Sequence, residues 1–165
     1  MSRKRIIFID GEEGTTGLEI YSRLSQSTDL EIIQLGEEKR KDISAREQAI
    51  NQSDITILCV PDKTARDAIT LIKNPKTTVI DASTAHRTTP GWDYGFTEYR
   101  PGHRNTLKQS KRISHPGCYA IGAISAIYPL VKKGILPCAW PLSINAVSGY
   151  SGGGKTLIRQ FETPI

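Results

Sequence analysis

A cysteine that follows a Pro-Gly pair is the first feature of the sequence that could carry out covalent chemistry. Cys118 lies in the stretch SHPGCYA, residues 114–120, and an apolar run over residues 121–130 follows it. Proline and glycine directly before a helical pattern predict that a helix begins at or near Cys118. The positive end of a helix dipole favours the thiolate, the nucleophilic form of a cysteine. Cys118 is therefore the predicted nucleophile.

The other two cysteines fit structural roles better. Cys59 lies inside the apolar run ITILCV of residues 55–60, which predicts a buried and unreactive thiol, and Cys138 is also predicted to be structural. His115 could form a Cys–His dyad with Cys118, but a histidine placed across a Pro-Gly turn is more often a loop residue. Three widely spaced cysteines form neither a disulfide framework nor a metal-binding pattern, so no metal site is predicted.

Three glycines near the N-terminus form the second motif. The stretch GEEGTTG, residues 11–17, comes directly after an apolar run and opens a helical pattern. Such glycines permit a tight turn and a close approach of the backbone to a pyrophosphate, while the helix N-terminus offers free N–H groups. The spacing is GxxGxxG rather than GxGxxG, so the signal depends on its strand–turn–helix context. The pattern predicts a dinucleotide site, and the alternative is glycines that serve helix packing alone.

The choice of cofactor depends on the residues that follow the second predicted strand. This segment reads GEEKRK over residues 36–41. An NAD enzyme places an acidic residue there, and Glu37 and Glu38 fall near that spacing. Lys39 and Arg40 follow at once, however, and cations suit a 2′-phosphate. We therefore predict NADP, bound through Lys39 and Arg40, whereas the alternative is a solvated surface loop.

A third motif has two interpretations. Residues 149–156, GYSGGGKT, satisfy the P-loop expression GxxxxGK[ST] and follow a predicted strand at residues 142–147. A P-loop NTPase also needs a later strand that ends in a magnesium-binding Asp, and its P-loop normally opens its own α/β domain. A P-loop-type nucleotide-binding protein is kept as the alternative function.

The remaining pattern supplies the elements that must position these motifs. Strands are predicted at residues 5–9, 30–35, 55–60 and 77–80, and helices at residues 18–25, 43–51 and 64–72. This strict alternation predicts an α/β fold with a Rossmann-type parallel sheet and right-handed crossovers. Residues 85–112, rich in Thr, Pro, Gly and basic residues, are predicted to be loop. We expect a dinucleotide-binding domain at 1–117 and the start of a second, α+β catalytic domain at 118–165.

Composition limits the class of protein, its location and its partners. Hydrophobic residues make up 38% and charged residues 24% of the chain, with a net charge of +5, as in soluble globular proteins. No apolar run reaches the roughly 18 residues of a membrane span, and no signal peptide is recognisable, so a cytoplasmic location is expected. A basic stretch could suggest nucleic-acid binding, but it lacks interleaved aromatic residues, and neither nucleic acid nor membrane is expected as a partner. That stretch contains Arg100, His103, Arg104, Lys108, Lys111 and Arg112.

Several segments together resemble the N-acetyl-γ-glutamyl-phosphate reductase family in its shorter-chain variety, within the aspartate-semialdehyde dehydrogenase-like enzymes. The specific segments are residues 10–17, 59–62 (CVPD), 81–88 (DASTAHRT), 114–120 and 148–155. The resemblance implies NADP-dependent reduction of N-acetylglutamyl 5-phosphate to N-acetylglutamate 5-semialdehyde through a cysteine thioester, a step of arginine biosynthesis. It also implies a homo-oligomer.

The resemblance also implies a role for individual residues. Cys118 matches the nucleophile, Arg87 an arginine near the substrate phosphate, and Ser148 and Gly149 a turn beside nicotinamide and substrate. Pro61 and Ser83 match residues that line the cofactor cleft. The residues that match the pyrophosphate-binding turn are Gly11, Gly14, Thr15, Thr16 and Gly17.

Two departures from the family pattern stand out. The segment YGFTE at residues 94–98 has Thr97 where the family has proline, which should loosen that loop. The family's acid/base histidine lies beyond the position of Ile165, and none of His86, His103 or His115 matches it. We therefore expect the chain to be a fragment, or to be completed by a second polypeptide. By itself it should turn over substrate slowly, and the alternative is an inactive nucleotide-binding fragment.

Overall fold

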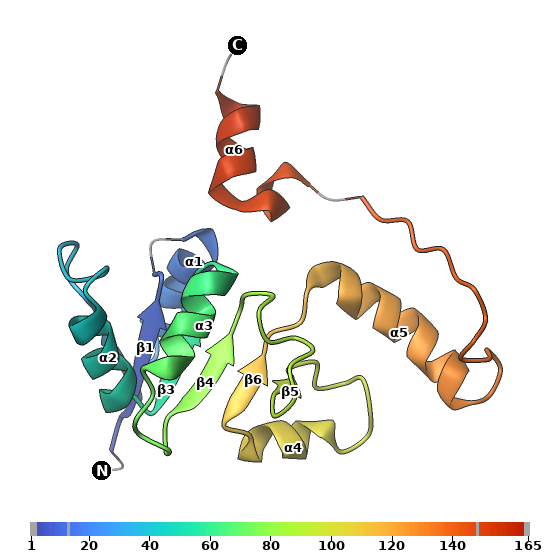
Figure 1. Ribbon diagram of the computed structural model, residues 1–165, viewed down its shortest axis with the longest axis horizontal. Helices are drawn as coiled ribbons and strands as arrows, with labels where there is room; N and C mark the ends of the chain where they lie inside the picture. The colour runs from blue at the N-terminus through green and yellow to red at the C-terminus, as the bar shows by residue number, and fades with distance from the viewer. Residues whose placement is uncertain (1–2, 13, 148, 164–165) are drawn as a thin grey trace.

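The computed structural model describes residues 3–12, 14–147 and 149–163. Its centre is a six-stranded sheet in which every pair of neighbours is parallel, in the order β2-β1-β3-β4-β6-β5 (Figure 1). The strands are β1 Arg5–Asp10, β2 Leu30–Ile33, β3 Ile55–Leu58, β4 Thr78–Asp81, β5 Asp93–Tyr94 and β6 Arg112–Ser114. The helices are α1 Thr15–Leu24, α2 Ile43–Gln52, α3 Asp62–Thr70, α4 His103–Gln109, α5 Cys118–Lys132, the 3-10 helix η1 Tyr150–Gly153, and α6 Gly154–Glu162. The predicted α/β class with a Rossmann-type parallel sheet is confirmed.

The sheet buries apolar side chains on both faces, because successive residues of a strand point to opposite sides. On one face Phe8 and Leu58 pack with side chains of α2 and α3. On the other face Ile7, Ile9 and Ile57 pack with side chains of α1. This two-sided burial explains why β1 and β3 read as continuous apolar runs in the sequence.

The prediction that residues 85–112 form a loop is wrong, because this segment contains β5 and α4 and leads into β6. Strands of two or three residues are too short to show a periodic pattern, and they form here because β6 pairs with both β4 and β5. α4 begins at His103, which is 2% exposed and whose Nε2 donates a hydrogen bond to the carbonyl oxygen of Tyr94 at 2.6 Å. His103 is therefore not part of the exposed basic stretch.

The helix predicted after the Pro-Gly pair is present, and it begins at Cys118 as expected. The strand predicted at residues 142–147 is wrong. Those residues form extended chain that belongs to none of the strands in the described part of the protein. A strand must exchange backbone hydrogen bonds with a neighbour, and Figure 1 shows this segment lying apart from the sheet, between the far end of α5 and η1. Described residues after 117 thus form helices and extended chain.

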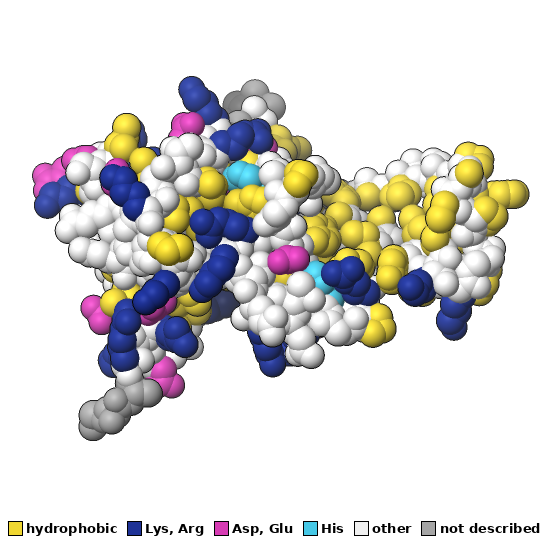
Figure 2. Space-filling view, turned by 60° about the horizontal axis from the view of Figure 1, so that its bottom comes forward, with side chains coloured by type: hydrophobic (Ala, Val, Ile, Leu, Met, Phe, Trp, Pro, Cys, Tyr) yellow, Lys and Arg dark blue, Asp and Glu magenta, His cyan; other side chains and the backbone are white. Residues whose placement is uncertain are grey.

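Side chains of different kinds gather on different parts of the surface. In Figure 2, hydrophobic side chains cover much of the projecting part formed by α5 and the chain that follows it. Most Lys and Arg side chains in this view lie on the part of the molecule that contains the sheet. None of the residues of α5 is buried. Within the described ranges, no helix is both long enough and apolar enough to cross a membrane.

Candidate active site

The glycine turn after β1 is built around contacts that exclude larger residues. Gly11 has a φ of 88°, and a Cβ atom there would lie 2.5 Å from the carbonyl oxygen of Cys59, at the end of β3. Gly17 is buried, and its Cβ would collide with the carbonyl oxygen of Gly11. Gly14 is the N-cap of α1 and donates its N–H to that same oxygen at 3.0 Å. The three predicted glycines therefore form one turn, with exposed Thr15 and Thr16 in the first turn of α1.

A cavity of about 310 Å³ opens beside this turn, at the carboxyl ends of β1, β2 and β3. The chain leaves β1 toward β2 and then crosses to β3 on the opposite side of β1, and such a switch point is where dinucleotides bind in open α/β sheets. Gly11 of the turn, Thr64 of α3 and the apolar side chains of Leu35 and Val60 line this space. The residues present fit a dinucleotide.

Two cations from the predicted charge run reach the cavity. Arg40 lines it, donates from Nε to the carbonyl oxygen of Leu35 at 3.3 Å, and lies 3.9 Å from the carboxylate of Glu12. Lys41 lines the same cavity, whereas Lys39 lines a separate hollow between the end of β2 and α2. Of the two predicted cations, Arg40 thus lines this cavity and Lys39 does not, while Lys41 of the same run lines it as well.

A buried ion pair forms part of the wall of this cavity. Arg46 of α2 binds Asp10 of β1 through Nη2 at 2.6 Å and Nε at 3.2 Å, with side chains 11% and 6% exposed. Sequence reasoning missed this pair, because it joins residues 36 positions apart and an arginine in a helix is usually exposed. The pair connects α2 to the strand that leads into the glycine turn.

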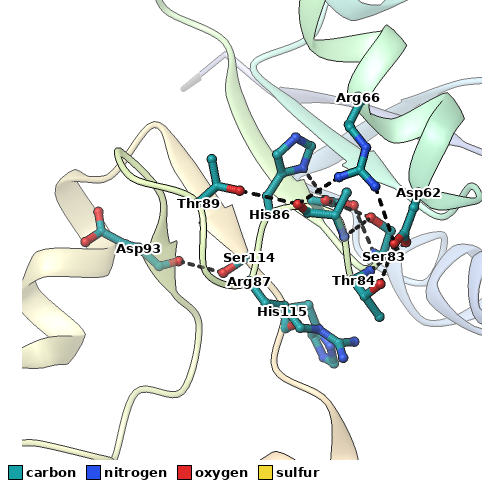
Figure 3. A network of polar contacts seen from close by, with 12 residues as sticks. Asp62, Arg66, Ser83, Thr84, His86, Arg87, Thr89, Asp93, Ser114 and His115 are labelled. Atoms are coloured by element: carbon teal, nitrogen blue, oxygen red, sulfur yellow. Dashed lines mark hydrogen bonds and ion pairs between the residues drawn. The ribbon is translucent and has the colours of Figure 1, made fainter.

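The turn after β4 holds a network of polar contacts (Figure 3). Asp81 is fully buried and accepts hydrogen bonds from the N–H and hydroxyl of Ser83, both at 2.9 Å, and from Nδ1 of His86 at 2.6 Å. The predicted cofactor residue Ser83 therefore uses its hydroxyl within the turn, and it also accepts from the N–H of Ala85 at 3.1 Å. The network fixes the backbone of this turn.

A second set of contacts joins the turn to α3. Predicted cofactor residue Pro61 is exposed and serves as the N-cap of α3, and Asp62 after it accepts from the N–H and hydroxyl of Thr84. These hydrogen bonds, together with the charges of Arg66 and Arg87, hold the pKa of Asp62 below its usual value. The loops that follow β3 and β4 are thus bonded to each other.

The same turn brings Arg87 to the start of α5. Its Nε donates to the carbonyl oxygen of His115 at 3.1 Å, and a Cβ atom built on Gly117 would lie 2.7 Å from its Nη1. Gly117 is the N-cap of α5, and the exposed Cys118 is the first residue of that helix. Two residues predicted from distant motifs, Arg87 and Cys118, are therefore close together in space.

The three thiols differ in their surroundings. Burial, followed by the charges of Asp10 and Asp81, raises the pKa of Cys59 to about 11, which keeps this thiol protonated at neutral pH. Cys138, predicted to be structural, is exposed, and the segment that carries it does not pack on the sheet. His115 lies beside Cys118 in sequence, and partial burial and the charge of Arg87 lower its pKa.

The predicted turn near the C-terminus lies partly outside the described residues. Ser148 lies outside the described residues, and Gly149 is exposed and accepts from the N–H of Gly152 at 3.0 Å. The cavity of about 530 Å³ beside Cys118 is lined by α5 and residues 142–146 rather than by Gly149. A P-loop joins a strand to a helix, whereas here extended chain leads through η1 to α6, so the P-loop alternative is not favoured.

Comparison with known proteins agrees with this geometry. A family model described as "Semialdehyde dehydrogenase, NAD binding domain" matches residues 7–109, which is more than half of the chain. A second model, "Semialdehyde dehydrogenase, dimerisation domain", matches residues 118–164.

Curated relatives are about half identical to the chain over the part that aligns. An N-acetyl-gamma-glutamyl-phosphate reductase 2 of Pseudomonas putida is 52% identical over 159 residues, which cover 96% of this chain and 51% of the relative. An N-acetyl-gamma-glutamyl-phosphate reductase of Burkholderia ambifaria is 51% identical over 158 residues, which cover 96% of this chain and 50% of the relative. The chain thus spans about half the length of the curated relatives it matches.

Solved structures support the fold. The aspartate semialdehyde dehydrogenase II of Vibrio cholerae matches with a TM-score of 0.66 at 15% identity, covering 98% of this chain and 51% of that one. At this identity the likeness concerns the fold alone. From the sheet, the glycine turn and the match over residues 7–109, the chain belongs to the semialdehyde dehydrogenase family.

Proposed function

We propose that the chain binds NADP and bears the nucleophile of an enzyme that reduces N-acetylglutamyl 5-phosphate to N-acetylglutamate 5-semialdehyde, a step of arginine biosynthesis. The observation that carries the proposal is the guanidinium of Arg87 against the N-cap of α5, beside Cys118. Arg87 and the helix N-terminus offer donors and positive charge to a phosphate, and Cys118 offers a nucleophile at the same place. The substrate class agrees with the names of the relatives.

In the proposed reaction the Cys118 thiolate attacks the acyl carbonyl, forming the S–C bond. The C–O bond to phosphate then breaks, and Arg87 stabilises the charge of the departing phosphate. Bound NADPH would supply the hydride that reduces the thioester. The glycine turn would hold the pyrophosphate through Gly11, Gly14, Thr15, Thr16 and Gly17. Ser83 and Pro61 would shape the cleft, and Ser148 and Gly149 would face the substrate.

The proposal extends to the organisation of the protein. Residues 1–117 would form the dinucleotide-binding domain, and residues 118–165 would belong to a catalytic domain through which copies of the chain associate. The match of a dimerisation-domain model to residues 118–164 supports this division. The partner molecule is a small acyl phosphate, and the proposed location is the cytoplasm.

The test is the formation of the thioester, which requires no hydride transfer. The purified chain is incubated with freshly generated N-acetylglutamyl 5-phosphate and its intact mass is measured. We expect one acyl group per chain, released by hydroxylamine and mapped to Cys118, because Cys118 is exposed and lies beside Arg87.

The matched controls are the two exposed thiols. Cys118→Ala should remove the adduct, and Cys138→Ala should retain it. An adduct on Cys138, or no adduct while the circular dichroism spectrum shows a folded chain, would contradict the proposed function.

The preference for NADP should depend on the cations that line the cavity. We expect the chain to bind NADPH about tenfold more tightly than NADH, because a charge-assisted contact with the 2′-phosphate adds affinity. Arg40→Ala and Lys41→Ala should each remove much of this preference, since both side chains line the cavity. Lys39→Ala is the control, because Lys39 lies at the neighbouring hollow. Fluorescence titration measures the affinities; equal affinities for the two cofactors in the unmodified chain would exclude an NADP-selective site.

A further inference from the structure

The position of Arg87 depends on a turn that has little regular structure of its own. Residues 82–89 belong to none of the helices and strands, and backbone contacts within them are weak, such as Arg87 N to Thr84 O at 3.5 Å. Arg87 is nevertheless aimed at one place, between the carbonyl oxygen of His115 and the N-cap Gly117. Side chains other than Arg87 must therefore hold this turn in place.

His86 is the residue best placed to do so. Its side chain is 7% exposed, its Nδ1 donates to the buried carboxylate of Asp81, and its ring stacks on Trp92 with centroids 4.1 Å apart and planes at 9°. His86 and Arg87 are consecutive, so an inward anchor at His86 fixes the point from which Arg87 projects outward. Figure 3 shows His86 on the side of Arg66 and Arg87 on the side of His115.

The rest of the turn is restrained from α3 and from within. Asp62 binds Thr84, and Nη1 of Arg66 donates to the carbonyl oxygen of Ala85 at 3.3 Å. The hydroxyl of Thr89 donates to the same oxygen at 3.3 Å. Most of these contacts hold the exposed rim of the turn. Ser83 and His86 both reach Asp81 at the end of β4, but the bond of His86 is buried and adjoins Arg87, whereas those of Ser83 are partly buried. Loss of the buried contact should therefore loosen the turn most.

We propose that His86 is a positioning residue, which holds the turn of residues 82–89 against Asp81 and thereby keeps the guanidinium of Arg87 beside the thiol of Cys118. The inference rests on the proposed role of Cys118. The positive charge near the thiol therefore depends on the N–H that His86 donates to Asp81, and not on the bulk of the His86 ring alone.

The test compares the alkylation of Cys118 by two reagents of similar size. Iodoacetate is negatively charged and iodoacetamide is neutral, so the ratio of their rates reports the positive charge beside the thiol. A neighbouring unit charge changes this ratio by about two- to threefold at low ionic strength, and salt screens the effect. A change in overall exposure of the thiol alters both rates together and leaves the ratio unchanged.

Two variants of His86 separate its hydrogen bond from its ring. The amide nitrogen of His86→Asn lies near the position of Nδ1 and retains the donor, whereas His86→Phe keeps an aromatic ring to stack on Trp92 and loses the donor. Arg87→Met gives the ratio expected when the charge is absent. Rates are measured at Cys118 by mass mapping, in low salt and in 1 M salt, with circular dichroism to verify folding.

We expect a high iodoacetate-to-iodoacetamide ratio in the unmodified chain and in His86→Asn. The ratio should be lower by about two- to threefold in His86→Phe and Arg87→Met, and these differences should vanish in 1 M salt. If His86→Phe does not fold, His86→Gln replaces it, because its amide lies nearer the position of Nε2 and should also lower the ratio.

Three results would overturn the inference: an unchanged ratio in Arg87→Met, an unchanged ratio in the folded variant that lacks the donor, or a ratio in His86→Asn as low as in that variant. The proposed function fails separately, if Cys118 forms no thioester, because the ratio is measured at Cys118 whatever its absolute rate.

Discussion

Replacing Arg46 with leucine is expected to lower the free energy of unfolding by about 3–5 kcal/mol, the cost of removing one partner from a buried ion pair. Arg46 and Asp10 are joined through two nitrogens, and both side chains are nearly inaccessible to water. Without Arg46, the carboxylate of Asp10 would stay in its buried position with its charge uncompensated. Urea denaturation followed by circular dichroism measures the change.

An exposed pair in the same chain is the matched control. Arg23 and Glu19 are one helical turn apart in α1, with side chains 77% and 66% exposed. Arg23→Leu should change the free energy of unfolding by no more than about 0.5 kcal/mol. The double variant Asp10→Leu, Arg46→Leu should recover much of the loss, because an apolar pair leaves no buried charge. A similar small cost for Arg46→Leu and Arg23→Leu would show that the pair is not buried in solution.

Gly11→Ala should cost about 3 kcal/mol and abolish dinucleotide binding. An L-residue at a φ of 88° is strained by about 1–2 kcal/mol, and the new methyl group would also press on the carbonyl oxygen of Cys59. That oxygen belongs to the backbone, so the ends of β1 and β3 must separate to make room. The proposed cofactor cavity lies at these strand ends, and its shape changes with them.

Two other glycines separate strain from collision. Gly91 has a φ of 82° but open space around it, so Gly91→Ala should cost only the strain, about 1 kcal/mol. Gly36 has neither feature, and Gly36→Ala should be neutral. The experiment measures urea denaturation and NADPH titration for all three variants. Equal costs for Gly11→Ala and Gly91→Ala would mean that the contact with Cys59 does not constrain the turn.

The sequence predicted those parts of the fold whose signals are local. Gly11, Gly14 and Gly17 lie within seven positions of each other, and a strand–turn–helix unit formed around them. The helix after Gly117 was predicted in the same way, from Pro116 and Gly117 before an apolar run. Each of these elements is specified by residues that are neighbours in the chain.

Other parts of the site could not be predicted, because they depend on residues far apart in sequence. β6 is three residues long and exists as a strand because β4 and β5 lie beside it. Asp81 and His86 are only five positions apart, but nothing in the segment DASTAH indicates that the histidine turns inward. The strand predicted at residues 142–147 failed for the converse reason, since its composition is apolar but no neighbouring strand is present among the described residues.

The position of β6 between β4 and β5 has a consequence for the order in which the sheet can assemble during synthesis. β5 leaves the ribosome before β6, yet its only pairing in the described sheet is with β6. The edge of β4 that faces away from β3 must therefore stay unpaired until residues 112–114 have been made. β5 joins the sheet last, although it precedes β6 in the chain. Until then the nascent chain exposes an open strand edge of the kind that promotes association with other chains.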